Sequence, residues 1–299
     1  MRYRNLSSYF REKYGKRLKK ICIDGGFSCP NRDGTVGLGG CIFCGERGSG
    51  EHIDIGKSIE EQVKRGLSHS SDDDLFVAYF QNFTNTYAPR AILKQRYDAA
   101  LIDNRIRVLA IGTRPDCIND EVAELIASYK ERVDVWVELG LQTSSDEVAK
   151  LINRGYKTEV YAKAVEILKK HGIPVVTHII IGLPGESIES IKQTVDYVSH
   201  NSVFGVKLHS IYVMRGTRLA ELYKKGEYTP PTKEEYIDCV CYAIKRLSPE
   251  TVFHRLTGDC PEGMLIAPSW NKDKNALLYS IGATLDELEV TQGELYEKI

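Results

Sequence analysis

The stretch from Cys29 to Cys44, CPNRDGTVGLGGCIFC, carries the strongest signal in this sequence. It spaces three cysteines as C-x11-C-x2-C in a glycine-rich segment with Pro30 and Asp33, a composition that resists helix and sheet formation. Three thiolates can hold three irons of a 4Fe-4S cluster and leave the fourth iron open for a substrate or cofactor, whereas a closed structural site takes four protein ligands. Cys29, Cys41 and Cys44 are therefore candidate ligands of an open cluster.

Cys22 offers an alternative. With Cys22 as a fourth thiolate, the same residues would form a zinc knuckle with four cysteine ligands. We favour the site with three cysteines, because Cys22 lies in the apolar run 21–23, where a buried strand cysteine is the ordinary occupant.

Length and composition are those of an ordinary globular protein. The chain has 299 residues and a formal net charge of -1, which gives no global attraction to nucleic acid or membrane. No apolar run approaches the roughly 18 residues of a membrane span, and no signal peptide is evident at the N-terminus. We expect a cytoplasmic protein that does not enter the membrane and whose cysteines are ligands or buried thiols.

The first 20 residues carry a local positive charge. They contain eight lysines and arginines against Glu12 alone, with Tyr3, Tyr9, Phe10 and Tyr14 interleaved. Such a segment can neutralise phosphates and stack on unpaired bases of RNA. It can equally form an amphipathic helix that closes one end of the fold, and the two interpretations are compatible.

Short apolar runs alternate with helical patterns along the chain. Strands are predicted at 20–23, 75–80, 108–112, 134–141, 175–181, 206–213 and 252–256. Helices are predicted near 58–68, 89–104, 119–130, 146–152, 159–171, 187–199 and 232–247. This alternation predicts parallel strands joined by right-handed crossovers, in a barrel or a doubly wound sheet. Either fold places its active site at the carboxyl ends of the strands, where the cysteine loop and several polar segments fall.

Together these motifs resemble the radical S-adenosylmethionine (SAM) superfamily, in the branch related to the catalytic subunit of elongator. The resemblance covers about residues 21–256, and the segments IDGGFSCPNRDG, YFQNFTNTYA and HRLTGD are similar to a small bacterial and archaeal group of that branch. It implies an α/β fold, a partial TIM-type (βα)6 barrel, over residues 21–250. A basic segment, 1–20, would precede it, and a C-terminal extension, 251–299, would pack on the barrel.

The resemblance also implies cofactors and their ligands. Cys29, Cys41 and Cys44 would bind a 4Fe-4S cluster, and its open iron would chelate the amino and carboxylate groups of SAM, whose reductive cleavage gives a 5'-deoxyadenosyl radical. The SAM-binding candidates are Gln81 with the region 81–86 for the amino group, Gln142 and His178 for the ribose, Arg154 for the carboxylate, Gly182 and Pro184 at the adenine edge, and Glu138, a strand carboxylate that needs SAM or a lysine as its partner. The alternative role for Arg154 is that of a helix cap before Gly155.

Candidate catalytic residues on the substrate side lie further along the chain. They are His209 and Tyr212 on the sixth predicted strand, and Arg255 and Asp259 in FHRLTGDCP. Lys207 shares a face with His209, while Tyr212 points the other way if that strand stays regular. Residues 254–274 could instead form a capping segment held by salt bridges.

The elongator-like resemblance implies tRNA as partner and the C5 side chain of its wobble uridine as substrate, with an electron donor of ferredoxin or flavodoxin type. The sequence ends before an acetyltransferase domain could follow, so we expect remodelling of carboxymethylaminomethyluridine to aminomethyluridine. Two alternatives remain open: a radical SAM enzyme acting on a small molecule or peptide, and a non-catalytic metal-containing module that binds nucleic acid.

Overall fold

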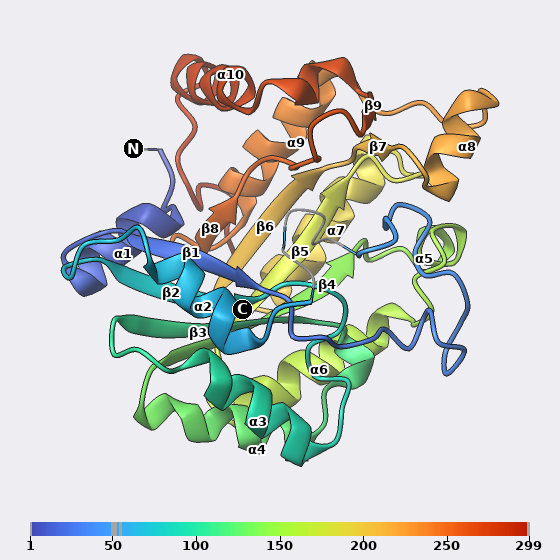
Figure 1. The fold of residues 1–299 in the computed structure, drawn as a ribbon. Helices are drawn as coiled ribbons and strands as arrows, with labels where there is room; N and C mark the ends of the chain where they lie inside the picture. Colours follow the sequence, from blue (N-terminus) through green and yellow to red (C-terminus); the bar gives the residue numbers. More distant parts are fainter. Residues whose placement is uncertain (1, 49–52, 54–55, 298–299) are drawn as a thin grey trace.

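The computed structural model of the chain describes residues 2–48, 53 and 56–297, so Met1 of the predicted basic segment and residues 298–299 of the predicted extension lie outside the described residues. Seven parallel strands form one sheet that curls into a half-barrel, with helices along its outer face (Figure 1). The strands of this sheet, in spatial order, are β1 (Leu18–Ile23), β2 (Leu75–Phe80), β3 (Ile106–Thr113), β4 (Asp134–Gln142), β5 (Val175–Ile181), β6 (Gly205–Ser210) and β8 (Val252–Arg255). The helices are α1 (Leu6–Tyr14), α2 (Ile59–Leu67), α3 (Arg90–Ala100), α4 (Asp120–Ser128), α5 (Asp146–Leu151), α6 (Thr158–Lys170), α7 (Ile188–His200), α8 (Arg218–Lys224), α9 (Lys233–Arg246) and α10 (Lys274–Glu287).

The predicted partial βα barrel is confirmed. Its sheet has seven strands rather than six, because β8 pairs in parallel with β6, from Gly205 opposite Val252. The residues of β8 were expected to be the first part of the C-terminal extension. They form the last strand of the sheet instead. β1 and β8 are the two edges of the sheet, so the half-barrel stays open between them.

The sixth strand is shorter than predicted. β6 ends at Ser210, and the apolar residues that follow form β7 (Val213–Met214), which pairs antiparallel with β9 (Leu265–Ala267) in a separate sheet. The Ser210 hydroxyl donates to Asn271 at 2.8 Å and accepts from the Gly258 amide at 2.8 Å. These two contacts, with Gly258 and Asn271, hold the chain at Ser210, and the parallel pairing of β6 ends there.

Local sequence explains most helix boundaries. Ser58 and Thr232 form capping boxes with the glutamates three residues later, which satisfies amide groups of the first turn. The helix predicted to reach residue 104 ends at Ala100. The Asp103 carboxylate accepts from the Arg105 amide at 2.9 Å, and this local turn replaces further helix.

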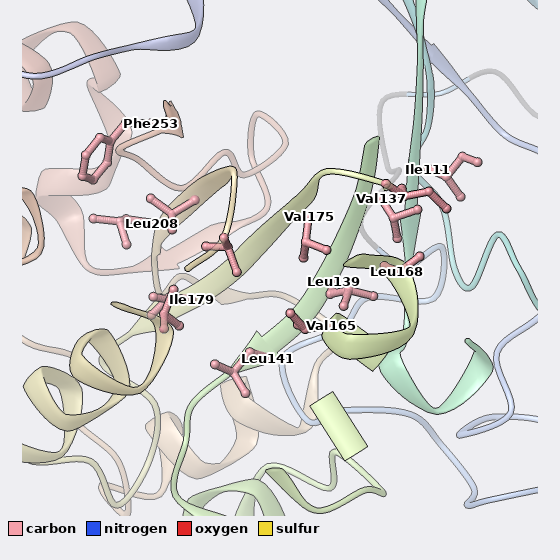
Figure 2. Close-up of a cluster of buried hydrophobic side chains, with 14 of the residues drawn as sticks. Ile111, Val137, Leu139, Leu141, Val165, Leu168, Val175, Ile179, Leu208 and Phe253 are labelled. Carbon is pink, nitrogen blue, oxygen red and sulfur yellow. The ribbon is translucent and has the colours of Figure 1, made fainter. Parts of the chain in front are cut away.

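The main core lies between the outer face of the sheet and the helices. Figure 2 shows Val137 and Leu139 of β4 beside Val165 and Leu168 of α6, and all four side chains are buried. Fully burying one such aliphatic side chain stabilises the fold by about 1.5–3 kcal/mol. The apolar side chains of the strands and helices thus pack together on the outer face of the sheet, which the helices cover.

A second core fills the amino-terminal end of the half-barrel. There Phe10 of α1 is buried and stacks on Trp136 of β4 with 6.2 Å between ring centroids, while Tyr9 packs edge-on against Phe204. These aromatic rings close one end of the fold, which is one of the two interpretations of the basic segment. The other is wrong for Phe10, because a ring inside the barrel is not available to stack on RNA bases.

The described helices include none that is both long and apolar enough to cross a membrane.

Candidate active site

A cavity of 690 Å³ opens at the carboxyl ends of the strands. It contains the three cysteines of the glycine-rich loop, Cys29, Cys41 and Cys44. The other sequence-predicted residues that line it are Gln81, Glu138, Gln142, Arg154, His178, His209, Tyr212, Arg255 and Asp259. The half-barrel therefore gathers at one place residues that lie more than 200 positions apart in the chain.

Backbone hydrogen bonds shape the cysteine loop. The Pro30 carbonyl accepts from the Val36 amide at 2.8 Å, and the Cys44 amide donates to the Cys41 carbonyl at 3.1 Å. The Asn31 side chain donates to the Asn153 carbonyl at 2.6 Å and lies 3.8 Å from the Cys41 sulfur. These contacts tie the loop to the end of α5 and hold Cys41 and Cys44 one turn apart.

The electrostatics of the thiols suit metal ligation. A hydrogen bond with the Cys44 thiol lowers the pKa of Cys41 to about 7, against the opposing effect of burial and with help from Arg114 and Arg154. The same hydrogen bond raises the pKa of Cys44. Because the thiolate is the ligating form, a site that favours one thiolate beside further thiols is prepared for a cationic centre.

The donor set fits a cluster. Across the described residues, no group of three His, Cys, Asp or Glu side chains is arranged to hold one metal ion. A 4Fe-4S cluster binds each thiolate through a different iron, so its cysteines stand farther apart than ligands of a single ion. All three cysteines line one cavity of 690 Å³, which has room for a cluster beside them.

Cys22 lines the same cavity but lies outside the cysteine loop. It is on β1, and the charged groups that act on it are Lys20, Lys207, Arg255 and Glu138, while burial raises its pKa. The other cysteines interact with one another and with Arg32, Arg114 and Arg154. This arrangement favours three cluster cysteines over a zinc knuckle with four.

The cavity is strongly cationic. Its described lining holds two carboxylates, Glu138 and Asp259. Against them stand seven basic side chains, namely Lys20, Arg32, Arg65, Arg114, Arg154, Lys207 and Arg255. In a chain whose formal net charge is -1, this concentration of positive charge makes the cavity a site for anionic ligands.

Glu138 is the centre of a buried polar cluster on the cavity floor. One carboxylate oxygen accepts from the Lys207 ammonium group and contacts Nε2 of His178 at 2.8 Å, and the other accepts from the Trp136 indole at 3.1 Å. Burial alone would raise the pKa of Glu138, but Lys207 and His178 hold it well below its usual value. A carboxylate only accepts, so His178 carries its proton on Nε2. The partner that the sequence demanded for Glu138 is thus a lysine.

Burial lowers the pKa of Lys207 to about 7, against the opposing effect of Glu138. It likewise lowers the pKa of His178. Lys207 therefore sits near the balance between its charged and neutral forms at physiological pH.

His209 and Tyr212 line the same cavity, which corrects the expectation that Tyr212 faces away. The strand ends at Ser210, so side-chain alternation does not continue to Tyr212. Burial lowers the pKa of His209 well below its usual value. Its Nε2 atom is buried and has no hydrogen-bond partner within the described residues.

Arg154 is occupied by the protein itself. Its guanidinium is 1% exposed, and its five N–H groups donate to the carbonyls of Leu141, Thr143 and Tyr156, to Thr158 and, at 3.5 Å, to Asp146. A SAM carboxylate would have to displace one of these partners. The geometry supports a structural role, nearer to the helix-end alternative than to the predicted contact with SAM.

Gln142 ends β4 with a positive φ of 63°, which turns its side chain back toward the Tyr156 hydroxyl at 3.2 Å. Gly182 and Pro184 are not among the described residues that line the cavity, although Ile180 and Ile211 beside them are. The role of the glycine-proline turn at the adenine edge stays a prediction.

Among the arginines that line the cavity, Arg32, Arg65 and Arg114 were not assigned to the site from the sequence. Arg114 follows β3, pairs with Asp116 at 2.7 Å and donates to the Arg154 carbonyl. Arg32, inside the cysteine loop, donates to the carbonyls of Gly45 and Glu46. The position of Arg114 after a strand and of Arg32 near Cys29 could have indicated that they belong to the site. A basic residue on a loop, however, is ordinarily exposed to solvent.

Comparisons with known proteins agree with this site. The family model described as Radical SAM superfamily matches residues 29–198, and that of the Radical_SAM C-terminal domain matches residues 203–287. The superfamily's cofactors are a 4Fe-4S cluster and SAM, as the sequence predicted.

Among curated relatives, "Uncharacterized protein YtqA" of Bacillus subtilis is 37% identical over 100% of this chain and 94% of its own length. A "tRNA uridine(34) acetyltransferase" of Methanocaldococcus infernus is 34% identical over 59% of this chain and 33% of its own length. The solved structure of Elp3 from the same archaeon shares the fold, with a TM-score of 0.70 and 21% identity, over 92% of this chain and 64% of that one. The chain belongs to the radical SAM superfamily and is a radical SAM enzyme related to Elp3.

Proposed function

We propose that the enzyme remodels the C5 side chain of the wobble uridine of tRNA, converting carboxymethylaminomethyluridine to aminomethyluridine. Loss of a hydrogen atom from the carbon between the nitrogen and the carboxylate, and then of one electron, would give an imine. Water would hydrolyse this imine to the amine and glyoxylate, and the electron released would replace the one used to cleave SAM.

The choice of tRNA rests on the relative named for its action on tRNA uridine 34, which is 34% identical over the matched part. The choice of an anionic side chain rests on the cavity, whose lining holds seven basic side chains and two carboxylates, with Arg114 and Lys207 already paired with Asp116 and Glu138. That excess of positive charge is the observation that carries the proposal.

Acetyl transfer is the less favoured modification. The likeness to the acetyltransferase covers a third of that protein's length, whereas YtqA is matched over 94% of its own. A reaction that needs only the shared half-barrel and its cavity accounts for the matched residues, and remodelling an existing side chain is such a reaction.

The bound cluster and SAM supply the hydrogen-abstracting radical chemistry of the superfamily. Cys29, Cys41 and Cys44 would hold the cluster on the loop side of the cavity. Gln81, Gln142 and His178 line the neighbouring wall and would contact SAM. The Glu138 carboxylate binds Nε2 of His178 and so fixes the orientation of the ring. The opposite edge of the ring would then contact SAM.

The substrate would enter on the side of β6 and β8. His209 lies in β6 and Tyr212 follows its end, while Arg255 is the last residue of β8 and Asp259 follows it, with 3.7 Å between the guanidinium and the carboxylate. These four side chains would orient the base and its C5 substituent. An electron donor of ferredoxin or flavodoxin type would complete the system.

Mass spectrometry of tRNA nucleosides from a deletion strain tests the proposal. Carboxymethylaminomethyluridine should accumulate, and nucleosides derived from aminomethyluridine should fall. A plasmid copy should restore them, and a Cys41→Ala copy should not. Unchanged nucleosides would contradict the proposal, and SAM cleavage stimulated by a small molecule or peptide but not by tRNA would favour the other substrate class.

A further inference from the structure

Two lysines from distant strands meet at the Tyr79 ring on the cavity floor. The Lys20 ammonium group, from β1, lies 4.9 Å from the ring centroid, and that of Lys207, from β6, lies 4.3 Å from it. Lys20 is on an edge strand with an exposed side chain, whereas Lys207 is 3% exposed. The pair therefore reaches from the open side of the half-barrel to its interior.

Arg255, on the other edge strand, adds a third cation. Its guanidinium contacts Asp259 at 3.7 Å and its side chain is 29% exposed. Glu138 attracts the Lys20 ammonium group, whereas Arg255 and Lys274 repel it. Glu138 thus attracts both lysines, whereas Arg255 repels both.

The oxygens of Glu138 are already engaged. They accept from Lys207, His178 and Trp136, which leaves this carboxylate little capacity to neutralise a second lysine. Next to these side chains, the His209 ring lies 5.2 Å from the His178 ring. The buried Nε2 atom of His209 has no hydrogen-bond partner within the described part of the chain. A buried polar atom without a partner costs free energy unless a ligand supplies one.

We propose that Lys20, Lys207, Arg255 and His209 form a subsite that binds the carboxylate at the end of the substrate's C5 side chain. This inference rests on the proposed function and names the feature of the substrate that the cavity recognises. Three cations and a ring N–H donor are the partners that a carboxylate prefers. A backbone phosphate is the less suitable anion because Lys207 is nearly buried. The end of a flexible side chain can reach it more easily than an RNA backbone can.

Two synthetic anticodon stem-loop RNAs test the subsite with the reconstituted enzyme. One carries carboxymethylaminomethyluridine at the wobble position, and the other carries its neutral amide, which has nearly the same shape. We expect the acid to bind with a Kd roughly 10- to 100-fold lower than the amide, as for the loss of a charge-assisted contact. Lys20→Gln and Arg255→Gln should each reduce this ratio to within about threefold. Both side chains are partly or fully exposed, so these variants should fold.

Arg17→Gln is the matched control, because Arg17 is an exposed basic residue at the opposite end of the half-barrel. It should keep the full preference for the acid. Equal affinity of the wild type for the two RNAs would overturn the subsite, and so would an equal loss of affinity for both RNAs in the Lys20 and Arg255 variants, which indicates a phosphate contact.

Product analysis in the same reactions separates the two proposals. Aminomethyluridine formed from the acid RNA without any preference for acid over amide would overturn the subsite and leave the proposed function standing. A strong preference for the acid without formation of aminomethyluridine would support the subsite and contradict the proposed reaction.

Discussion

The carboxylate of Glu138 on β4 accepts a hydrogen bond from the ammonium group of Lys207 on β6, across the inner face of β5. Both side chains are almost completely buried. This ion pair links three neighbouring strands at the floor of the cavity, because His178 of β5 bonds to the same oxygen. It connects the stability of the half-barrel to the charge that the site offers its ligands.

Glu138→Gln should destabilise the fold by about 3–5 kcal/mol at pH 6, because it leaves Lys207 buried without a counter-ion. Urea unfolding measures this cost. The double variant Glu138→Leu, Lys207→Met should cost less than the single change, since it removes both charges. A double variant as unstable as the sum of the two single variants would contradict the pairing.

Stability should depend on pH through Lys207. Its folded pKa of about 7 lies below the ordinary value of 10.5, so the unfolded chain binds the proton more tightly. The contribution of this group to the free energy of unfolding therefore rises with pH between these two values. We expect the wild-type gain between pH 7 and 9, measured by urea unfolding, to shrink in Lys207→Met, and an identical gain would contradict the assignment.

Ligand affinity should respond in the opposite sense. An anion binds the charged form of Lys207, so the Kd of the acid RNA should rise above pH 7, by at most about tenfold per pH unit. The other charged or titratable groups that act on this ammonium are Lys20, Cys22, Tyr79, Glu138, His178, His209, His254 and Arg255. The amide RNA controls for pH effects that do not involve the substrate carboxylate, and a pH dependence equal for both RNAs would exclude Lys207 as the cause.

Phe10→Ala should cost about 3–5 kcal/mol, because the ring fills the amino-terminal end of the half-barrel against Trp136. Thermal and urea unfolding measure the loss, and Arg11→Gln on the exposed side of the same helix should change stability by less than about 0.5 kcal/mol. A cost below about 1 kcal/mol for Phe10→Ala would show that α1 does not belong to the cooperative core.

Arg154→Gln should lower folding stability even without SAM, because the guanidinium bonds to three backbone carbonyls around the end of α5. We expect a loss of about 2–4 kcal/mol. Lys150→Gln, an exposed change on the same helix, should be neutral. Unchanged unfolding with weakened SAM binding would restore the original prediction that Arg154 holds the SAM carboxylate.

The sequence predicted elements better than it predicted contacts. The alternation of apolar runs and helical patterns located the strands, and Ser58 and Thr232 marked helix starts. Tyr212 was misplaced because the end of β6 depends on Asn271, a residue 61 positions from Ser210. Such a distant contact leaves no trace in local periodicity.

In the site, too, residue types were easier to predict from the sequence than their contacts. Cysteine spacing identified the cluster loop, and a buried carboxylate at Glu138 implied a cationic partner. Lys20 was assigned to the basic segment and to the start of the first predicted strand but not to the site, because its place in the cavity depends on β1 being an edge strand that turns its even-numbered side chains inward. The saturation of Arg154 was equally hidden, since its partners are backbone carbonyls, which every residue carries.

The central claim is that Cys29, Cys41 and Cys44 hold a cluster that cleaves SAM. The most direct test is anaerobic reconstitution with iron and sulfide, followed by measurement of 5'-deoxyadenosine from SAM with dithionite as reductant. Wild type and Cys22→Ala should form 5'-deoxyadenosine, and Cys41→Ala should form none. A wild-type protein that binds stoichiometric zinc and forms no 5'-deoxyadenosine would contradict the account.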